Sequence, residues 1–259
     1  MRENMIQTRL GEGRAAVGAS LNVYSPHLVE LIGAIGFDWV FIDCEHGSMS
    51  EPEAESMMRA AETYGIAPVV RVPANEPQLI LRMLDAGAMG IVVPHVDNVD
   101  DARRAAAAAK YPPLGQRGSN YGTGRNNQYG AGTSSALEYY DQSNERTILF
   151  ALIESQDGVD NIDEILSVDG IDATWLGPAD MALSMGMPEQ RVVDEALDMV
   201  VTKTVAAGKI AAATHPAPEV VDKIGHFHAL GARVLAVSAF ALLKQSAGPW
   251  HDTVRALDS

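Results

Sequence analysis

Residues 39–94 read WVFIDCEHGSMSEPEAESMMRAAETYGIAPVVRVPANEPQLILRMLDAGAMGIVVP. In this stretch, short apolar runs rich in Val and Ile alternate with longer segments of helical spacing. The apolar runs are Trp39–Asp43, Pro68–Val72 and Gly90–Pro94, and the helical segments open at Ser50-Glu51-Pro52-Glu53 and Asn75-Glu76-Pro77. Continuous apolar runs are typical of parallel strands buried on both faces, and a capping residue near Pro is typical of a helix start. The stretch therefore predicts successive parallel strands joined by helices.

The same alternation continues on both sides of this stretch. Five more strands are predicted at Ala15–Leu21, Thr147–Ile153, Ala173–Leu176, Ile210–Thr214 and Arg233–Ser238. Further helices are predicted at His27–Ile35, Asn98–Ala109, Asp157–Leu166, Pro188–Ala207, Pro218–Leu230 and Phe240–Leu257. Eight strand–helix units in 259 residues predict a single α/β domain over residues 1–259, a closed (β/α)8 (TIM) barrel. A doubly wound open sheet is the alternative, but Gly18-Ala19-Ser20-Leu21-Asn22 is a poor match to its Gly-rich phosphate turn.

One segment interrupts the alternation. Residues 111–132 are rich in Gly, Pro, Asn and Tyr. A loop of this length in a compact domain is usually functional or disordered, and its aromatic content favours order. We expect an ordered loop over the barrel mouth.

Composition narrows the function class. The net charge of −15 disfavours nucleic-acid binding, which depends on clustered Lys and Arg. No apolar run approaches the roughly 18 residues of a membrane span, and no apolar segment of a secretory signal follows Met1. The single cysteine, Cys44, excludes an intramolecular disulfide and a thiolate-cluster zinc site. Together these features favour a cytoplasmic protein without nucleic-acid or membrane partners.

Polar residues gather where the predicted strands end. They are Asp43, His46, Arg71, Glu154 and the segment Gly177-Pro178-Ala179-Asp180. In (β/α)8 barrels the carboxyl ends of the strands meet at one mouth, which carries the active site. We therefore expect these side chains to converge.

Two of these residues suit a metal ion. Glu154 and Asp180, without thiolates nearby, offer the oxygen ligands that Mg²⁺ or Mn²⁺ prefers, with Co²⁺ as a further option. Two protein ligands leave positions for a chelating 2-oxo acid, and the metal would act as a Lewis acid on its enolate. His46 is then the expected general base, with Asp43 orienting its imidazole. Arg71 would face the developing oxyanion, and the backbone N–H groups near Ala179 and Asp180 would hold a carboxylate.

Lysine usage argues against the rival aldolase chemistry. The five lysines are Lys110, Lys203, Lys209, Lys223 and Lys244, and none lies at the carboxyl end of a predicted strand. A Schiff-base mechanism needs a lysine in the mouth, so we reject it.

The motifs resemble the class II pyruvate aldolases of the HpcH/HpaI family, which includes 4-hydroxy-2-oxoheptanedioate and 2-dehydro-3-deoxyglucarate aldolases. They are Gly36-Phe37-Asp38-Trp39, Asp43-x-Glu45-His46-Gly47, Val70-Arg71-Val72-Pro73, Tyr111-Pro112-Pro113-x-Gly115-x-Arg117-Gly118, Ile153-Glu154 and Gly177-Pro178-Ala179-Asp180. The match runs in order from about Val17 to Leu243, and the combination is specific although no single motif is.

The resemblance implies more than the spacing does. It implies that Glu154 and Asp180 are the metal ligands, that His46 and Asp43 form the catalytic dyad, and that Arg71 contacts the pyruvate oxygen. It also implies a homo-oligomer, with a hexamer favoured and the C-terminal helix swapped between subunits, and Asp85 lent to the neighbouring subunit's site. The sequence departs from the family's usual pattern at Ser20 and at the polar Thr214-His215. These residues would line the acceptor pocket, so they bear on the choice of aldehyde.

We therefore predict a metal-dependent aldolase, a carbon–carbon lyase that forms or cleaves 4-hydroxy-2-oxo acids through a metal-bound pyruvate enolate and an aldehyde. The alternatives are a Claisen-type condensing enzyme or an oxaloacetate decarboxylase on the same enolate, and a catalytically silent barrel that serves as a scaffold. Two residues stay open: His95 either lines the mouth or is structural, and Arg117 either braces a loop or subunit contact or binds an anion.

Overall fold

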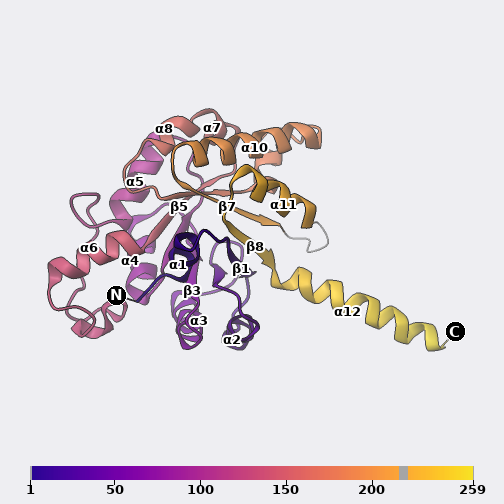
Figure 1. Cartoon of the computed structure of the whole chain (residues 1–259), viewed down its shortest axis with the longest axis horizontal. Coiled ribbons are helices and arrows are strands. Elements are labelled where there is room, and N and C mark those ends of the chain that lie inside the picture. The colour runs from indigo at the N-terminus through magenta and orange to yellow at the C-terminus, as the bar shows by residue number, and fades with distance from the viewer. Residues whose placement is uncertain (1, 216–220, 259) are drawn as a thin grey trace.

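The computed structural model describes residues 2–215 and 221–258. Eight parallel strands close into a barrel, with each strand hydrogen-bonded to the next in sequence and β8 to β1 (Figure 1). The strands are β1 (Ala16–Leu21), β2 (Trp39–Asp43), β3 (Ala67–Arg71), β4 (Gly90–Val93), β5 (Ile148–Ile153), β6 (Ala173–Leu176), β7 (Ile210–His215) and β8 (Val234–Ser238). The predicted (β/α)8 barrel is confirmed.

The helices also follow the predicted order. They are α1 (Met5–Gly11), α2 (Pro26–Ile35), α3 (Glu51–Thr63), α4 (Pro77–Ala86), α5 (Val99–Ala109), α6 (Ala136–Arg146), α7 (Gln156–Asp160), α8 (Ile162–Leu166), α9 (Pro178–Ser184), α10 (Gln190–Ala206), α11 (Val221–Leu230) and α12 (Ala239–Arg255). Helices α1, α6 and α9 have no counterpart among the predicted ranges, and the single helix predicted at Asp157–Leu166 is divided at Asn161. Part of the helix predicted at Pro218–Leu230 lies outside the described residues.

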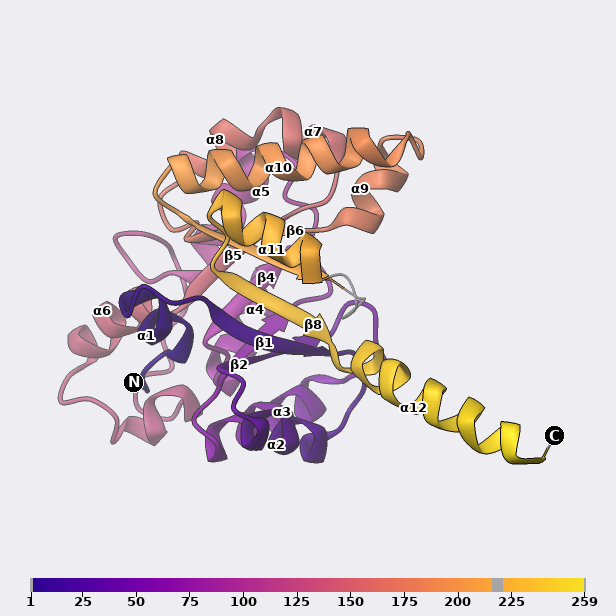
Figure 2. The same cartoon turned by 45° about the vertical axis from the view of Figure 1, so that its right-hand side comes forward.

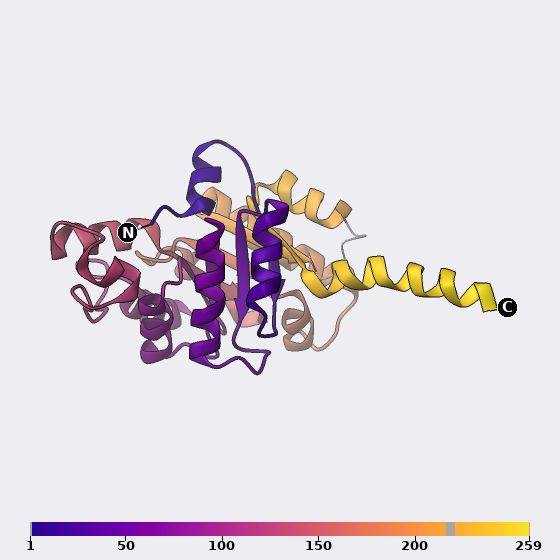
Figure 3. The same ribbon diagram turned by 90° about the horizontal axis from the view of Figure 1, so that it is seen from below.

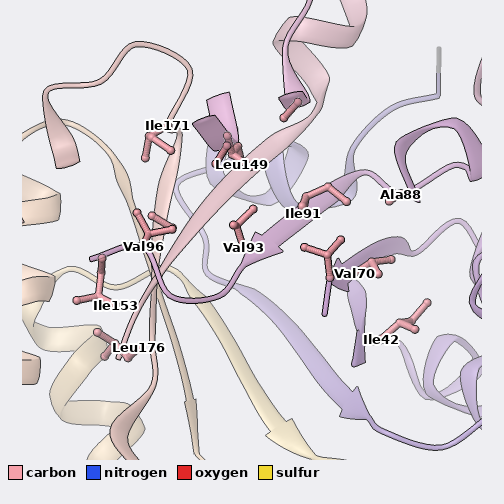
Figure 4. Packing of buried hydrophobic residues seen from close by; sticks show 14 of the residues in the cluster. Ile42, Val70, Ala88, Ile91, Val93, Val96, Leu149, Ile153, Ile171 and Leu176 are labelled. Carbon is pink, nitrogen blue, oxygen red and sulfur yellow. The ribbon is translucent and has the colours of Figure 1, made fainter. Parts of the chain in front are cut away.

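Buried side chains form two layers around the sheet. Trp39, Phe41, Phe150 and Trp175 fill the barrel interior, where the rings of Phe41 and Trp175 stack at 4.7 Å. The outer layer lies between strands and helices, and Figure 4 shows members of it from successive strands. Gly18 of β1 leaves room for the interior layer, because a Cβ there would lie 2.3 Å from the Trp39 ring. This close packing gives the mouth a rigid floor.

The prediction that residues 111–132 cover the mouth is wrong. They fold around the short 3-10 turn η1 (Arg125–Gly130), beside α6 and away from the start of α12 (Figure 2). Arg125 donates to the carbonyl of Ala86 at 2.7 Å and pairs with Glu62, and both acceptors lie near helix ends that lead into the next strand. The segment therefore lies at the amino-terminal end of the barrel, where it closes the face opposite the mouth.

The C-terminal helix α12 leaves the barrel and projects away from it (Figures 1 and 3). None of its residues is buried. Its apolar residues recur alternately three and four positions apart, which places them on one face. They are Phe240, Leu243, Ala247, Trp250 and Val254, and Trp250 is 69% exposed. Beyond its start, which contacts β1 and β8, the helix thus presents an apolar stripe with no partner among the described residues of its own barrel.

Within residues 2–215 and 221–258, no helix has the length and apolar character needed to span a bilayer.

Candidate active site

A cavity of about 770 Å³ opens at the carboxyl ends of the strands. Most of the predicted site residues line it. They are Ser20, Asp43, His46, Arg71, Gly177, Pro178, Ala179, Asp180 and Thr214. The backbone of His215 ends β7, but its side chain lies outside the described residues. The closed barrel therefore brings together residues that are up to 194 positions apart in the chain (Ser20 to Thr214), as the position of the strand ends predicted.

Arg71 is held by two carboxylates. Its Nε donates to Asp43 Oδ1 at 2.9 Å, its Nη2 donates to Asp43 Oδ2, and its Nη1 lies 2.9 Å from Glu45 Oε2 in an ion pair that lacks hydrogen-bond geometry. Burial lowers the pKa of Arg71, but the hydrogen bond and charge of Asp43 and the charges of Glu45 and Glu154 outweigh this, so the pKa is raised. The guanidinium is therefore a fixed cation at the cavity wall, and Glu45 is a site residue that the strand-end search did not single out.

The expected contact between Asp43 and the imidazole of His46 is not formed among the described residues. Asp43 Oδ1 instead accepts the backbone N–H of His46 at 3.2 Å and that of Glu45 at 3.1 Å. The imidazole is 61% exposed, and its Nε2 lies 3.8 Å from Glu45 Oε2. Asp43 thus shapes the turn that carries His46, while its carboxylate charge is directed to Arg71.

Glu154 lies just behind the cavity wall and is 3% exposed. A Cβ at Gly177 would lie 2.5 Å from Glu154 Cβ and 3.1 Å from Oε2, so only glycine leaves room for this carboxylate. Burial raises the pKa of Glu154; the backbone N–H and charge of His95 oppose the rise, and the charges of Glu45 and Asp180 add to it. Glu154 is therefore a buried acid surrounded by other negative charges.

His95 holds Glu154 from the end of β4. Its backbone adopts a left-handed conformation, with φ of 54°, and its N–H donates to Glu154 Oε1 at 2.9 Å. Its Nδ1 lies 3.3 Å from the same oxygen and its Nε2 3.9 Å from Glu45 Oε1. Non-glycine residues seldom hold this conformation, and such strain collects at functional sites. His95 therefore lies at the mouth end of the barrel beside Glu154 and Glu45, although it is not among the described residues that line the cavity.

The carboxylate set fits a divalent cation. Asp43 and Glu45 pair with Arg71, whereas Glu154 is repelled by the charges of Glu45 and Asp180, so a hard dication would offset the excess negative charge around Glu154. Among the described residues, no group of three or more His, Cys, Asp or Glu side chains is arranged to hold a metal ion. Glu154 and Asp180 are close enough for their charges to interact, so these two carboxylates could hold a cation that takes its further ligands from substrate or water.

Lys244 and Asp85 occupy positions that differ from the expectations drawn from the sequence. Lys244 lines the cavity from the second turn of α12, so the expectation that no lysine reaches the mouth is wrong. Asp85 lies at the end of α4, at the amino-terminal end of the barrel, where Arg117 Nη2 donates to it at 2.7 Å. Arg117 is buried and its guanidinium lies over the Tyr111 ring, so it braces the segment that follows α5. Asp85 is therefore remote from the cavity of its own chain.

Comparison with known proteins identifies the chain's relatives. A family model described as HpcH/HpaI aldolase/citrate lyase matches residues 18–238. The chain belongs to this family. The 2-keto-3-deoxy-L-rhamnonate aldolase of Shigella sonnei (strain Ss046) is 31% identical over 242 residues, which cover 91% of this chain and 89% of that protein. Membership in the HpcH/HpaI family confirms the predicted enzyme class, a carbon–carbon lyase of the aldolase type.

Two solved structures share the whole barrel. The HpcH/HpaI aldolase from Desulfitobacterium hafniense DCB-2 superimposes with a TM-score of 0.86 at 28% identity, covering 96% of each chain. The citrate synthase SbnG superimposes with a TM-score of 0.85 at 28% identity, covering 98% of this chain and 99% of that one. Proteins described as an aldolase and as a citrate synthase therefore have barrels similar to this one.

Proposed function

We propose that this enzyme is a divalent-metal-dependent aldolase that adds the enolate of pyruvate to an aldehyde and catalyses the reverse cleavage of 4-hydroxy-2-oxo acids. The observation that carries the proposal is Arg71, clamped between Asp43 and Glu45 at a cavity beside the buried Glu154. A guanidinium has five N–H donors, and Asp43 accepts from two of them, so three remain for Glu45 and a substrate oxygen. We further propose that residues 1–259 act as one domain in the cytoplasm.

The chain's own residues have distinct roles in this reaction. Glu154 and Asp180 would hold Mg²⁺ or Mn²⁺, and the bound cation would supply Lewis-acid stabilisation of the enolate charge. Arg71 donates to the oxygen that becomes negative, and Gly177–Asp180 bind the carboxylate of the 2-oxo acid. His46, exposed at the cavity, takes the proton from the methyl group. Asp43 positions both Arg71 and the turn that carries His46.

The enzyme should exchange the methyl protons of pyruvate with solvent deuterium without any aldehyde present. We expect NMR to show that EDTA abolishes this exchange and that Mn²⁺ restores it. The His46→Ala variant should exchange the protons roughly 10² times more slowly than the wild type and should still bind the metal. His228→Ala, on the exposed surface of α11, is the matched control. Exchange that persists in EDTA would contradict the metal, and a wild-type rate in His46→Ala would remove His46 as the base.

A Claisen-type condensation on the same enolate is the second candidate, favoured by the similarity to the citrate synthase SbnG. Oxaloacetate decarboxylation passes through this enolate too. All three reactions would use Arg71 and the carboxylates for the same enolate, which then attacks an aldehyde, attacks an acyl carbonyl with loss of its leaving group, or takes up a proton. Product analysis with pyruvate plus aldehydes, pyruvate plus an acyl donor, and oxaloacetate alone separates them.

We also propose that the active form is a homo-oligomer, with a hexamer favoured, in which α12 packs on a second copy of the chain. The apolar stripe of α12 has coiled-coil spacing, and Val17 on the adjoining barrel wall is 46% exposed. Asp85 would then serve a neighbouring subunit's cavity, because it is remote from its own.

Disrupting the stripe should dissociate the oligomer. Trp250→Asp places a charge in the middle of the stripe, so we expect light scattering to give a smaller particle mass than that of the wild type. Gln245→Asp, on the opposite face of α12, should leave the mass unchanged. If Trp250→Asp keeps the wild-type mass, α12 is not the assembly element.

A further inference from the structure

The cavity has two chemically different sides. One side carries Asp43, His46, Arg71 and the segment Gly177–Asp180, which the proposed function assigns to pyruvate. The other side is built from the ends of β1, β7 and β8 and the start of α12. Its polar residues are Ser20, Asn22, Thr214, Ser238 and Lys244. The aldehyde must therefore approach along this second side.

Lys244 is the one charged side chain among the described residues of the second side. The other four lysines all have partners: Lys110, Lys203 and Lys223 each pair with an aspartate, and Lys209 donates to two backbone carbonyls. No described residue forms an ion pair or a hydrogen bond with Lys244. An ammonium group directed at a cavity without a protein partner is available to a ligand.

Arg71 is not available to bind a charged group on the second side of the cavity. Its charge is balanced by Asp43 and Glu45, and it lies on the pyruvate side. Lys244 lies in the second turn of α12, directly after β8, and its flexible stem lets the charge follow the far end of a bound molecule. The hydroxyl groups of Ser20 and Thr214 also line the cavity and suit hydroxyl groups of the same molecule.

We propose that the acceptor aldehyde carries an anionic group, a carboxylate or a phosphate, at the end remote from its carbonyl, and that Lys244 binds this group. The inference rests on the proposed aldolase function. It assigns Lys244 to specificity, so Lys244 has no part in forming the enolate. The charge is exposed at the rim, so the preference should weaken with added salt.

The test compares aldehydes with and without the negative charge. Succinate semialdehyde is paired with butanal, and glyceraldehyde 3-phosphate with glyceraldehyde, each with pyruvate and saturating Mn²⁺. The wild type should prefer one charged member over its neutral partner in kcat/KM. Lys244→Met should lower kcat/KM for that aldehyde by about tenfold or more, since a charge-assisted hydrogen bond is lost, and for the neutral partner by less than about twofold. Lys244→Arg should retain most of the preference.

Lys223→Met, on α11 and paired with Asp194, is the matched control and should change neither value. The pair that shows the selective loss identifies the anion as carboxylate or phosphate. Equal losses for charged and neutral aldehydes, or a wild type that prefers neither charged aldehyde, would overturn the assignment of Lys244. Pyruvate methyl exchange, measured on every variant, separates failure of the Lys244 assignment from failure of the proposed function. If the wild type shows no exchange, the proposed aldolase function is contradicted.

Discussion

Glu154→Gln and Asp180→Asn should each leave the enzyme without a tightly bound divalent cation and reduce aldol cleavage by roughly 10³-fold, in line with the several kcal/mol that a Lewis acid supplies. A neutral amide keeps the shape of the side chain but lacks the charge that a hard cation needs. Glu154 packs so closely against Gly177 that any side chain there would meet its carboxylate, so the position of Glu154 is fixed by packing. Metal content after dialysis and calorimetric titration with Mn²⁺ measure the first effect.

Stability separates loss of metal from loss of fold. Burial and the charges of Glu45 and Asp180 raise the pKa of Glu154, so the ionised group is unfavourable in the folded protein without a cation. Removing that charge should not lower the metal-free Tm. Mn²⁺ at about 100 times its Kd should stabilise the wild type by roughly 2.7 kcal/mol and the variants by much less. Glu164→Gln, on the exposed surface of α8, is the control. Full metal retention by both site variants would refute the ligand assignment.

Arg71→Lys is expected to lower kcat by about 10² and leave Mn²⁺ affinity intact, the usual effect of losing one oxyanion donor. Lysine keeps the charge, but its three donors cannot hold Asp43 and Glu45 in the same geometry and still reach a substrate oxygen. Arg71→Ala should be worse, because Asp43 and Glu45 would then lie together without a cation.

Two reactions measured side by side test the role of Arg71. Oxaloacetate decarboxylation and aldol cleavage share the enolate, so both rates should fall together in Arg71→Lys at saturating Mn²⁺. Arg82→Lys, which keeps an exposed pair with Glu51, is the control and should behave as the wild type. A variant that decarboxylates normally but no longer cleaves aldols would place Arg71 on the aldehyde side.

Much of the site could be predicted because strand ends can be located in the sequence. Apolar runs marked β2, β3, β5 and β6 to within about a residue, and parallel strands in a closed barrel must deliver Asp43, Arg71, Glu154 and Asp180 to the same end. The misplaced segment 111–132 could have been placed by the same rule. A helix that starts at the mouth, as α5 does, ends at the opposite face, so the residues after it lie there.

Three features depended on tertiary structure. Asp43 pairs with Arg71 instead of the His46 imidazole because neighbouring strands set these residues opposite each other, a register that no local pattern encodes. The left-handed backbone of His95 is held by its bond to Glu154, 59 residues away. Lys244 reaches the cavity only because α12 starts at the end of β8 and leaves the barrel. Hydrophobic periodicity determines where each element begins and ends, whereas the pairing of charged side chains is decided by how those elements are set against one another in space.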